Sequence, residues 1–236
     1  MYRNTFLSVM FLACCFNGSL CAQSDAQIYE RTCDAKTYPF SDPSPVATPN
    51  NSYYPYFRFD GFSMQAQEKQ WKMVVLENDY VKLTVTPEIG GKIWGAIDKV
   101  NNKEFVYTNG VVKFRDVAMR GPWTSGGIEF NFGIIGHAPT CSTPIDYLTK
   151  KNVDGSVSCH IFSYEWITRT VWNVEISLPK DKAYFTTHTT WFNQSSIDQP
   201  YYQWMNAGYA TKTGTRFYYP GTYSICLLYT SDAADE

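Results

Sequence analysis

Apolar and polar residues alternate along most of the chain after residue 53, and this period of two predicts β-strands, because a strand turns successive side chains to opposite faces. The segments that show it, rich in β-branched and aromatic residues, are 56–59, 71–76, 80–86, 104–108, 156–164, 166–178, 184–193 and 201–210. Residues 87–94 predict a turn that leads directly into another strand. No segment has the apolar stripe of an amphipathic helix. We therefore expect an all-β, antiparallel domain, either a sandwich or a barrel.

The beginning of the chain has the features of a secretory signal peptide. An apolar stretch follows Arg3 and ends near Leu20-Cys21-Ala22, and it is shorter than the roughly 20 residues that span a bilayer. We expect residues 1–22 to be removed, the mature protein to be secreted or periplasmic, and no segment to cross a membrane. A lipoprotein is the alternative, since Leu12-Ala13-Cys14 loosely resembles a lipid-attachment sequence.

The rest of the chain divides into three parts. Residues 23–52 are polar and contain Pro39, Pro43, Pro45 and Pro49, which predicts a lead-in or linker. Residues 53–225 carry the strand pattern and form the domain. Residues 226–236 resemble the translated end of an adapter used for DNA sequencing libraries. We therefore expect the natural sequence to continue after residue 225 and the domain to be truncated at its C-terminus.

Composition excludes several classes of partner. The net charge is -2 and the pI is about 5.9, so the sequence offers no basic surface for nucleic acid. Between the two ends the cysteines are Cys33, Cys141 and Cys159, and no Cys-x-x-Cys pair occurs. We expect no metal site and no cofactor. An oxidising compartment permits one disulfide, for which Cys141 with Cys159 is the best pairing, and the odd count leaves that pairing open.

Chemically active side chains concentrate in residues 120–137, where five glycines and a proline exclude a helix. Glycine also allows a backbone to approach a ligand closely. The side chains between these glycines are a guanidinium, an indole, a carboxylate, an amide and an imidazole, from Arg120, Trp123, Glu129, Asn131 and His137. This set is typical of a polar pocket with an aromatic wall, and it favours a sugar as the ligand.

Glu129 and His137 are the candidate catalytic residues. Strand alternation directs Glu129 away from the faces of Ile128 and Phe130, and partial burial among aromatic rings would raise its pKa. His137 stands in a Gly-His-Ala-Pro loop, and Arg120 could orient a ligand. The structural alternatives are an ion pair between Glu129 and Arg120, and a histidine that only caps a turn.

A second group of candidate binding residues comes from residues 201–207. Tyr202, Trp204 and Asn206 fall on one face of the expected strand, because they are two residues apart. Together with Trp123 they would make the floor and wall of a sugar site. The alternative is that the aromatic residues belong to the core, and this alternative is favoured for Trp204.

Several motifs resemble known proteins. The segment 83–98, with its Pro-Glu-Ile-Gly-Gly turn at 87–91, resembles the opening of galactose-mutarotase-like proteins. The segments 126–132 with Gly136-His137 and Pro139, 172–178 and 201–207 resemble a bacterial family of unknown function with that fold, whose members often precede tetratricopeptide repeats. The resemblance covers roughly residues 70–220. It implies an antiparallel β-supersandwich that handles sugars.

Aldose epimerases of this kind open and close a sugar ring with a histidine that donates a proton and a carboxylate that removes one, and each group contributes roughly 10² to 10⁴ in rate. Related sandwiches process glycosides, so the fold alone leaves the reaction open. The epimerase base lies far toward the C-terminus, so a catalytic role for Glu129 rests on its local chemistry. We expect acid–base chemistry on a sugar, epimerase-like or glycosidase-like. The alternative is a non-catalytic carbohydrate-binding or scaffold module that precedes helical repeats.

Overall fold

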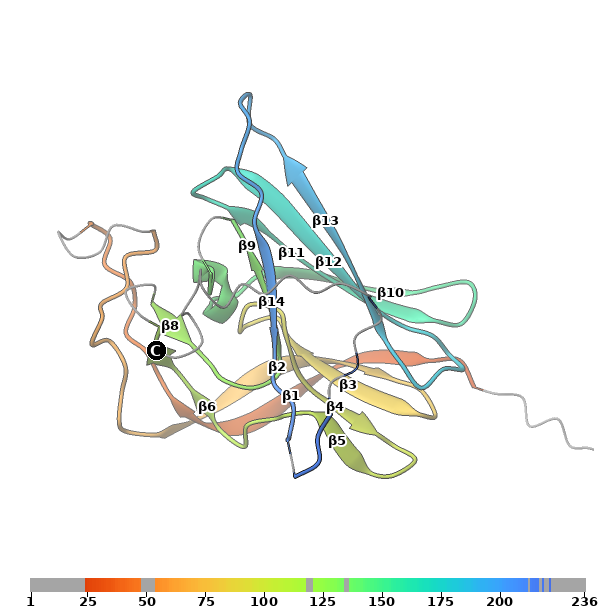
Figure 1. The fold of residues 1–236 in the computed structure, drawn as a ribbon. Coiled ribbons are helices and arrows are strands. Elements are labelled where there is room, and N and C mark those ends of the chain that lie inside the picture. The colour runs from red at the N-terminus through yellow and green to blue at the C-terminus, as the bar shows by residue number, and fades with distance from the viewer. Residues whose placement is uncertain are drawn as a thin grey trace, which may run out of the picture.

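The computed structural model describes residues 24–47, 54–117, 121–133, 136–211, 213–216, 218 and 221. Regular structure in this part of the chain is β, apart from one short 3₁₀ helix, η1 (Pro139–Ser142) (Figure 1). The strands are β1 (Gln27–Tyr38), β2 (Gln67–Glu77), β3 (Val81–Thr86), β4 (Lys92–Asp98), β5 (Lys103–Val106), β6 (Val112–Lys113), β7 (Arg115–Asp116), β8 (Pro122–Trp123), β9 (Ile128–Phe132), β10 (Asp146–Lys151), β11 (Val157–Glu165), β12 (Thr170–Leu178), β13 (Thr186–Asn193) and β14 (Gln203–Ala207).

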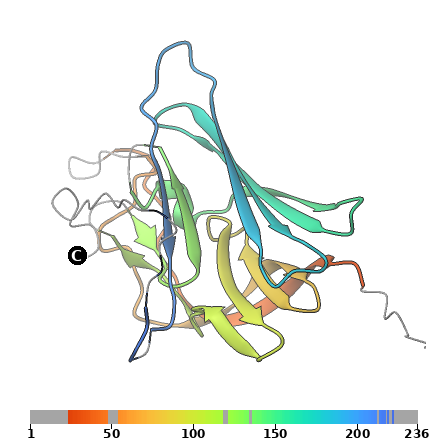
Figure 2. The same cartoon turned by 45° about the vertical axis from the view of Figure 1, so that its right-hand side comes forward.

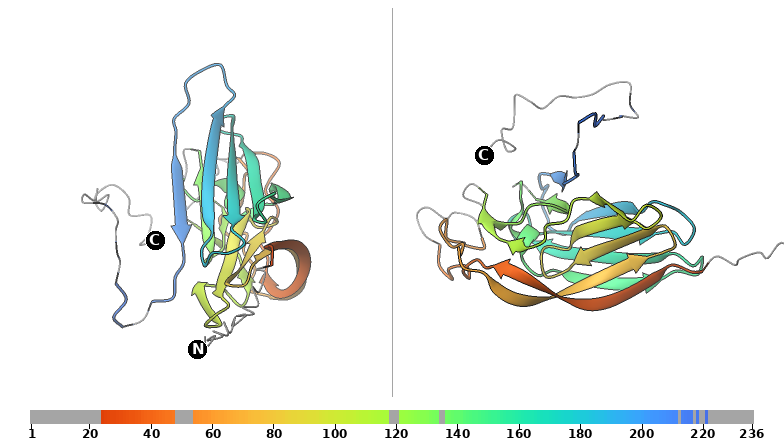
Figure 3. Two further views of the ribbon diagram at one scale, coloured as in Figure 1. Left: turned by 90° about the vertical axis from the view of Figure 1, so that its right-hand side faces the viewer. Right: turned by 90° about the horizontal axis from the view of Figure 1, so that it is seen from below.

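The larger sheet has eight strands in the order β14-β9-β4-β3-β2-β1-β6, with β5 also paired to β4. Its pairs are antiparallel except β1 with β6. The long strands β1 and β2 pair over almost their whole length and curve together (Figure 3). A register shift in β3–β4 between Thr84 and Val85 adds an irregularity near the middle of the sheet.

The smaller sheet is the four-stranded meander β10-β11-β12-β13, and it lies over one face of the larger sheet (Figures 1 and 2). Strand β12 shows why the layers form. Its residues alternate strictly between buried and half-buried, and the buried set is Thr170, Trp172, Val174, Ile176 and Leu178. A strand with one apolar face stabilises the fold only when that face is packed against another layer.

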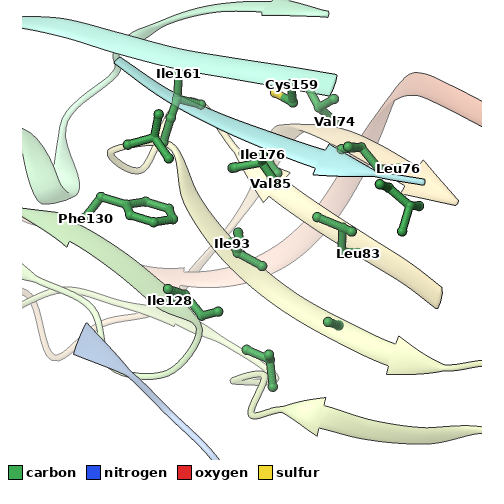
Figure 4. Packing of buried hydrophobic residues seen from close by; sticks show 14 of the residues in the cluster. Val74, Leu76, Leu83, Val85, Ile93, Ile128, Phe130, Cys159, Ile161 and Ile176 are labelled. Atoms are coloured by element: carbon green, nitrogen blue, oxygen red, sulfur yellow. The ribbon is translucent and has the colours of Figure 1, made fainter. Parts of the chain in front are cut away.

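The main core lies between the two sheets (Figure 4). Val74, Leu83 and Ile93 from the larger sheet meet Ile161 and Ile176 from the smaller sheet, and all five side chains are fully buried. Burial of one such aliphatic side chain contributes about 1.5–3 kcal/mol. Phe132 of β9 stacks on Trp172 of β12, with ring centroids 4.6 Å apart. This contact fixes the end of β9 that bears the candidate site.

These sheets confirm the expected all-β, antiparallel sandwich. The expected strands at 71–76, 80–86, 104–108, 156–164, 184–193 and 201–210 correspond to β2, β3, β5, β11, β13 and β14. The turn at 87–94 leads into β4 as expected. None of the helices in the described residues is long and apolar enough to cross a membrane.

Three local expectations were wrong. Residues 56–59 form no strand, since only Tyr56 makes an isolated bridge, to Ser44, in a segment rich in proline. Residues 166–169 are a turn, so β12 begins only at Thr170. The segment 23–52 contains β1, the longest of these strands. Its sequence lacks an apolar alternation, because few of its side chains are buried and several are charged.

The expected disulfide between Cys141 and Cys159 is also absent, because both thiols are free. Cys159 lies in the main core on β11, whereas Cys141 lies in η1, where its Sγ is 3.8 Å from the carbonyl oxygen of Pro122. The two cysteines therefore serve different packing contacts. Cys33, on β1, is free as well.

Candidate functional site

The candidate site is built on β9, the one strand in which every residue is buried. Ile128, Phe130 and Phe132 face the main core, and alternation turns Glu129 and Asn131 to the opposite face. That face is covered by β8 and η1, so the two polar side chains lie inside the protein. A buried carboxylate in such a position requires partners for its charge and its lone pairs.

Glu129 has these partners. The indole Nε1 of Trp123 donates to Oε2 at 2.6 Å, and the amide Nδ2 of Asn131 donates to Oε1 at 2.7 Å. Nδ1 of His137 lies 2.8 Å from the same Oε1. An ionised carboxylate can only accept a hydrogen bond, so Nδ1 carries the proton. Nε2 is then the ring nitrogen that can accept another proton. Asn131 in turn accepts a hydrogen bond from the backbone N–H of Ala138 at 2.7 Å, which ties the histidine loop to β9.

Lys92 is the cation of the site, and the sequence did not single it out. Its Nζ lies 3.9 Å from Oε2 of Glu129 and donates to the carbonyl oxygen and the hydroxyl of Thr124. Its side chain is only 1% exposed. The signal that could have revealed it is a lysine directly after Gly90-Gly91, at the start of an otherwise apolar strand.

The pKa of Glu129 corrects the sequence-based expectation. Burial raises it, as expected, but the hydrogen bond from His137 and the charge of Lys92 outweigh the burial, so the pKa lies below its usual value. Burial lowers the pKa of Lys92, and the attraction of Glu129 opposes that shift. Burial also raises the pKa of the Cys141 thiol well above its usual value. Because its pKa lies below the usual value, the carboxylate of Glu129 is ionised at neutral pH.

His137 is held between two indoles. Its ring packs edge-on against Trp204, with centroids 4.6 Å apart, and against Trp123, with centroids 5.4 Å apart. Its backbone φ is 51°, a left-handed conformation that is uncommon for any residue other than glycine. Strained backbone of this kind is concentrated at functional sites, where the surrounding structure holds it in place.

Strand β14 closes the site on the other side. In its ladder with β9, Trp204 lies opposite Asn131 and Asn206 lies opposite Glu129. A cavity of about 200 Å³ opens beside Glu129. It is lined by Lys92, Trp123, Gly126, Gly127, Glu129, Asn206, Ala207 and Gly208. This volume lies below the roughly 300–1,000 Å³ of pockets for drug-sized ligands, so the cavity suits a small ligand, on the scale of one sugar ring.

The structure therefore brings together most of the residues selected from the sequence. Glu129, His137, Trp123, Asn131 and Trp204 are in mutual contact, and Asn206 lines the cavity. Tyr202 is not part of the cluster, since it precedes β14 and is exposed. Arg120 lies outside the described residues, so the cation seen beside Glu129 is Lys92.

The sequence profile of a domain of unknown function, DUF5107, matches residues 48–235. The chain belongs to the DUF5107 family. The matched segment includes β2 to β14 and every candidate residue of the site. The family description agrees with the resemblance to a bacterial family of unknown function.

A solved structure is similar to this DUF5107 chain, namely the crystal structure of a TPR-domain-containing protein from Parabacteroides distasonis. The TM-score is 0.71 and the sequence identity is 27%. The match covers 78% of this chain and 32% of the solved chain. The chain thus spans about a third of the length of that protein, and the shared β fold is one part of it.

The site of this DUF5107 domain has a limited chemical repertoire. Within the described residues, no group of three or more histidine, cysteine, aspartate or glutamate side chains could hold a metal ion. The groups that can move protons are the Glu129 carboxylate and the His137 imidazole, and the Lys92 ammonium lies beside them, with a pKa that burial lowers. The aromatic rings and the asparagines add a surface for stacking and hydrogen bonding.

Proposed function

We propose that this domain binds a carbohydrate in the cavity beside Glu129 and carries out acid–base chemistry on it with Glu129 and His137. The observation that supports this proposal is the 2.8 Å contact between the two side chains. Glu129 lines the cavity together with Trp123, and His137 lies behind Glu129, outside the cavity lining. The resemblance to galactose-mutarotase-like sandwiches supports a sugar as the ligand. We also propose, from residues 1–22, that the protein is secreted or periplasmic.

The lone pairs of Glu129 suggest how a ligand would meet the pair. A carboxylate has about four acceptor sites. The described residues fill three of them: two on Oε1, and one on Oε2 that Trp123 occupies. The remaining site is on Oε2, and Glu129 lines the cavity. A sugar hydroxyl in the cavity would donate to Oε2, while His137 would give or take the second proton.

The other residues then have binding roles. Trp123 and Trp204 would form apolar walls for the sugar ring, Asn206 would bond a hydroxyl from the cavity floor, and Arg120 would help to orient the ligand. The proposal covers both the opening of a hemiacetal ring and the cleavage of a glycosidic bond. Cleavage with two carboxylates would need a second acid across the scissile bond.

A specific observation supports a second candidate function, a non-catalytic carbohydrate-binding or scaffold module. His137 is only 6% exposed, and three of the acceptor sites of Glu129 already serve protein groups. A cluster with these contacts could simply stabilise β8, β9 and η1. The solved relative that contains a TPR domain supports an association of such a module with helical repeats.

Two substitutions distinguish the functions, Glu129→Gln and His137→Asn. The full chain is assayed by polarimetry for mutarotation of reducing sugars, and by release of reducing ends from a panel of glycans. Each substitution is expected to lower turnover by about 10² or more, because it removes one proton-transfer group. The matched control is Glu104→Gln, an exposed carboxylate on β5, which should leave turnover unchanged.

The outcome assigns the function. If turnover survives both substitutions, Glu129 and His137 are not the catalytic residues. If no sugar is turned over but glycan binding persists, the domain is a binding module. Urea unfolding of each variant separates a chemical loss from a loss of the folded state.

A further inference from the structure

A second aromatic surface lies in the turn between β11 and β12. The indole of Trp166 is 65% exposed, which is unusual for a large apolar ring. The turn that carries it is rigid, because the buried carboxylate of Glu165 accepts hydrogen bonds from the backbone N–H groups of Ile167 and Thr168, at 3.0 and 2.5 Å, and from the Thr168 hydroxyl. The ring is therefore held out toward solvent in a fixed position.

Two tyrosines extend this surface. The ring of Tyr164 packs edge-on against Trp166 with centroids 5.0 Å apart, and the ring of Tyr54 does so with centroids 6.1 Å apart. Tyr54 is 51% exposed and comes from the distant segment before β2. We call Tyr54, Tyr164 and Trp166 the aromatic platform. Its rings come from two separate parts of the chain, so the tertiary fold assembles it.

The platform borders a cavity of about 210 Å³ whose lining is nearly neutral. Tyr54 and Trp166 line it together with the hydroxyl-bearing side chains of Thr140, Thr143 and Ser163. The one charged residue in the lining is Glu165, whose carboxylate already bonds the backbone of its own turn. The cavity thus offers aromatic faces and neutral hydroxyls, and it offers no free charge that would select an ionic ligand.

This cavity continues into a larger one and reaches the candidate site. The larger cavity has a volume of about 380 Å³ and shares Tyr54, Pro55, Thr143 and Pro144 with the smaller one. Its lining includes the aromatic rings of Phe57 and Trp71 and three charged side chains, those of Asp42, Lys69 and Glu88. The Lys69 ammonium lies over the Trp71 ring, and Glu88 accepts the backbone N–H of Lys72, so two of these three charges already have protein partners. Ala138, the residue directly after His137, lines the smaller cavity. The groove formed by the two cavities therefore runs past η1 and begins one residue from His137.

We propose that the platform and this groove form a second carbohydrate site, which binds a chain of neutral sugars. Aromatic rings stack on the apolar faces of pyranose rings, and neutral hydroxyls exchange hydrogen bonds with sugar hydroxyls. The larger cavity of the groove has a volume of about 380 Å³, against about 200 Å³ for the cavity beside Glu129, so the groove has room for more of a sugar chain than that cavity. The proposal shares the ligand class of the proposed function, and it rests on different residues.

Affinity gel electrophoresis of the full chain tests the site. The gels contain one neutral polysaccharide each: hydroxyethylcellulose, xyloglucan, galactomannan or glycogen. We expect at least one of them to retard the protein, and Trp166→Ala to weaken that binding about tenfold or more, as expected for an aromatic residue at the centre of a binding surface. Trp166→Phe keeps a ring and should keep most of the binding. Tyr184→Ala is the matched control, since Tyr184 is exposed and lies outside both cavities.

Other results would overturn the proposal. It is wrong if none of the four polysaccharides retards the protein, or if Trp166→Ala binds as tightly as the unmodified chain. Binding of polygalacturonate alone would show an anionic ligand, and binding of a polyproline peptide alone would show a peptide groove. A dimer that Trp166→Ala dissociates would show that a second copy occupies the groove.

Glu129→Gln separates this site from the proposed function. It should abolish turnover and leave the retardation by polysaccharide unchanged, because it does not line the groove. If Glu129→Gln abolishes the retardation as well, the polysaccharide binds at Glu129 and the second site is refuted. If turnover is never found while Trp166→Ala still weakens binding, the proposed chemistry fails and the second site stands.

Discussion

At the scale of single residues, the ion pair of Lys92 and Glu129 favours the ionised form of the Glu129 carboxyl group. Both side chains are almost completely buried, and their charged atoms are 3.9 Å apart. Removal of one partner from a buried pair leaves an uncompensated charge and costs about 3–5 kcal/mol. The three hydrogen bonds to Glu129 would remain, yet they alone do not replace the cation. Lys92 therefore acts as a positioning residue that keeps the carboxylate ionised.

We predict that Lys92→Met lowers the free energy of unfolding at pH 7 by about 3 kcal/mol. The methionine keeps most of the side-chain volume, so the loss reports the missing charge and its bonds to Thr124. The measurement is urea unfolding of the full chain. The control is Lys82→Met, which removes a partly exposed ion pair with Glu77 (3.3 Å) and should cost less than about 1 kcal/mol. Equal losses for the two variants would contradict a special role for Lys92.

The same variant has a predicted pH dependence. In the unmodified chain the pKa of Glu129 is lowered by folding, so its stabilising contribution is complete above the unfolded pKa, about 4.3, and is lost as the pH falls through the folded pKa. Without Lys92 the lowering by its charge is lost, so the pKa of Glu129 rises. The destabilisation by Lys92→Met should therefore be largest at pH 7 and smaller at pH 5. A cost that does not vary with pH would indicate lost packing alone.

At the scale of elements, the site depends on how closely β4, β9 and β14 approach. Gly127 lies at the entry to β9 with φ +69°, and a Cβ added there would be 2.3 Å from the carbonyl oxygen of Ile93. The carbonyl oxygen of Gly127 accepts a hydrogen bond of 2.8 Å from the N–H of Gly208, the residue directly after β14. The junction therefore requires both a left-handed backbone and a bare Cα at this position.

We predict that Gly127→Ala destabilises the domain by about 2 kcal/mol or more, from the strained φ and the clash together. It should also displace Asn206 from its place opposite Glu129 and weaken sugar binding in the cavity. Thermal or urea unfolding measures the first effect. Gly110→Ala is the control, because nothing lies within 4 Å of a Cβ at Gly110, and its effect should stay within about 0.5 kcal/mol.

The elements also show what the sequence could reveal. Strands β3 and β12 were predictable because alternation in sequence follows from burial of one face. Strands β2 and β13 were predictable from their β-branched and aromatic residues, since β2 ends in four consecutive buried residues and β13 has none. Strand β1 was missed because it is charged and largely exposed, and its place in the sheet comes from pairing with β2 rather than from its own apolar face. Residues 166–169 continue the alternation but form a turn, because the side chain of Glu165 bonds the backbone there.

The candidate site was predictable in part for a related reason. The glycines between Trp123 and His137 indicated a bend that would gather polar groups, and Glu129, Asn131 and His137 do meet there. Alternation could not reveal Lys92, because β4 is buried on both faces at that end, and the one signal was its place directly after Gly90-Gly91. The pKa of Glu129 was predicted to rise because only burial was considered. The hydrogen bond from His137 and the charge of Lys92, a residue distant in sequence, together lower it.

At the scale of the whole molecule, the main core lies between the two sheets. Cys33, Cys141 and Cys159 differ in how deeply they are buried. Cys159 lies in the main core, Cys141 is a buried residue of η1, and Cys33 lies on β1, where it is partly exposed. Burial raises the pKa of Cys159 to about 12 and that of Cys141 well above its usual value. Thiolate is the reactive form, so both buried thiols are unreactive while the sandwich is closed.

We predict that pulse labelling with N-ethylmaleimide at neutral pH modifies Cys33 in the folded chain and spares Cys141 and Cys159, as measured by peptide mass spectrometry. Added urea should make Cys159 reactive along the same curve as global unfolding, because its burial depends on the contact between the two sheets. Cys141 should become reactive at lower urea if β8 and η1 open before the sandwich does. The fully unfolded chain, in which Cys33, Cys141 and Cys159 all react, is the reference. Rapid labelling of Cys159 without urea would mean that the smaller sheet does not cover the larger one in solution, and the core between the two sheets would be wrong.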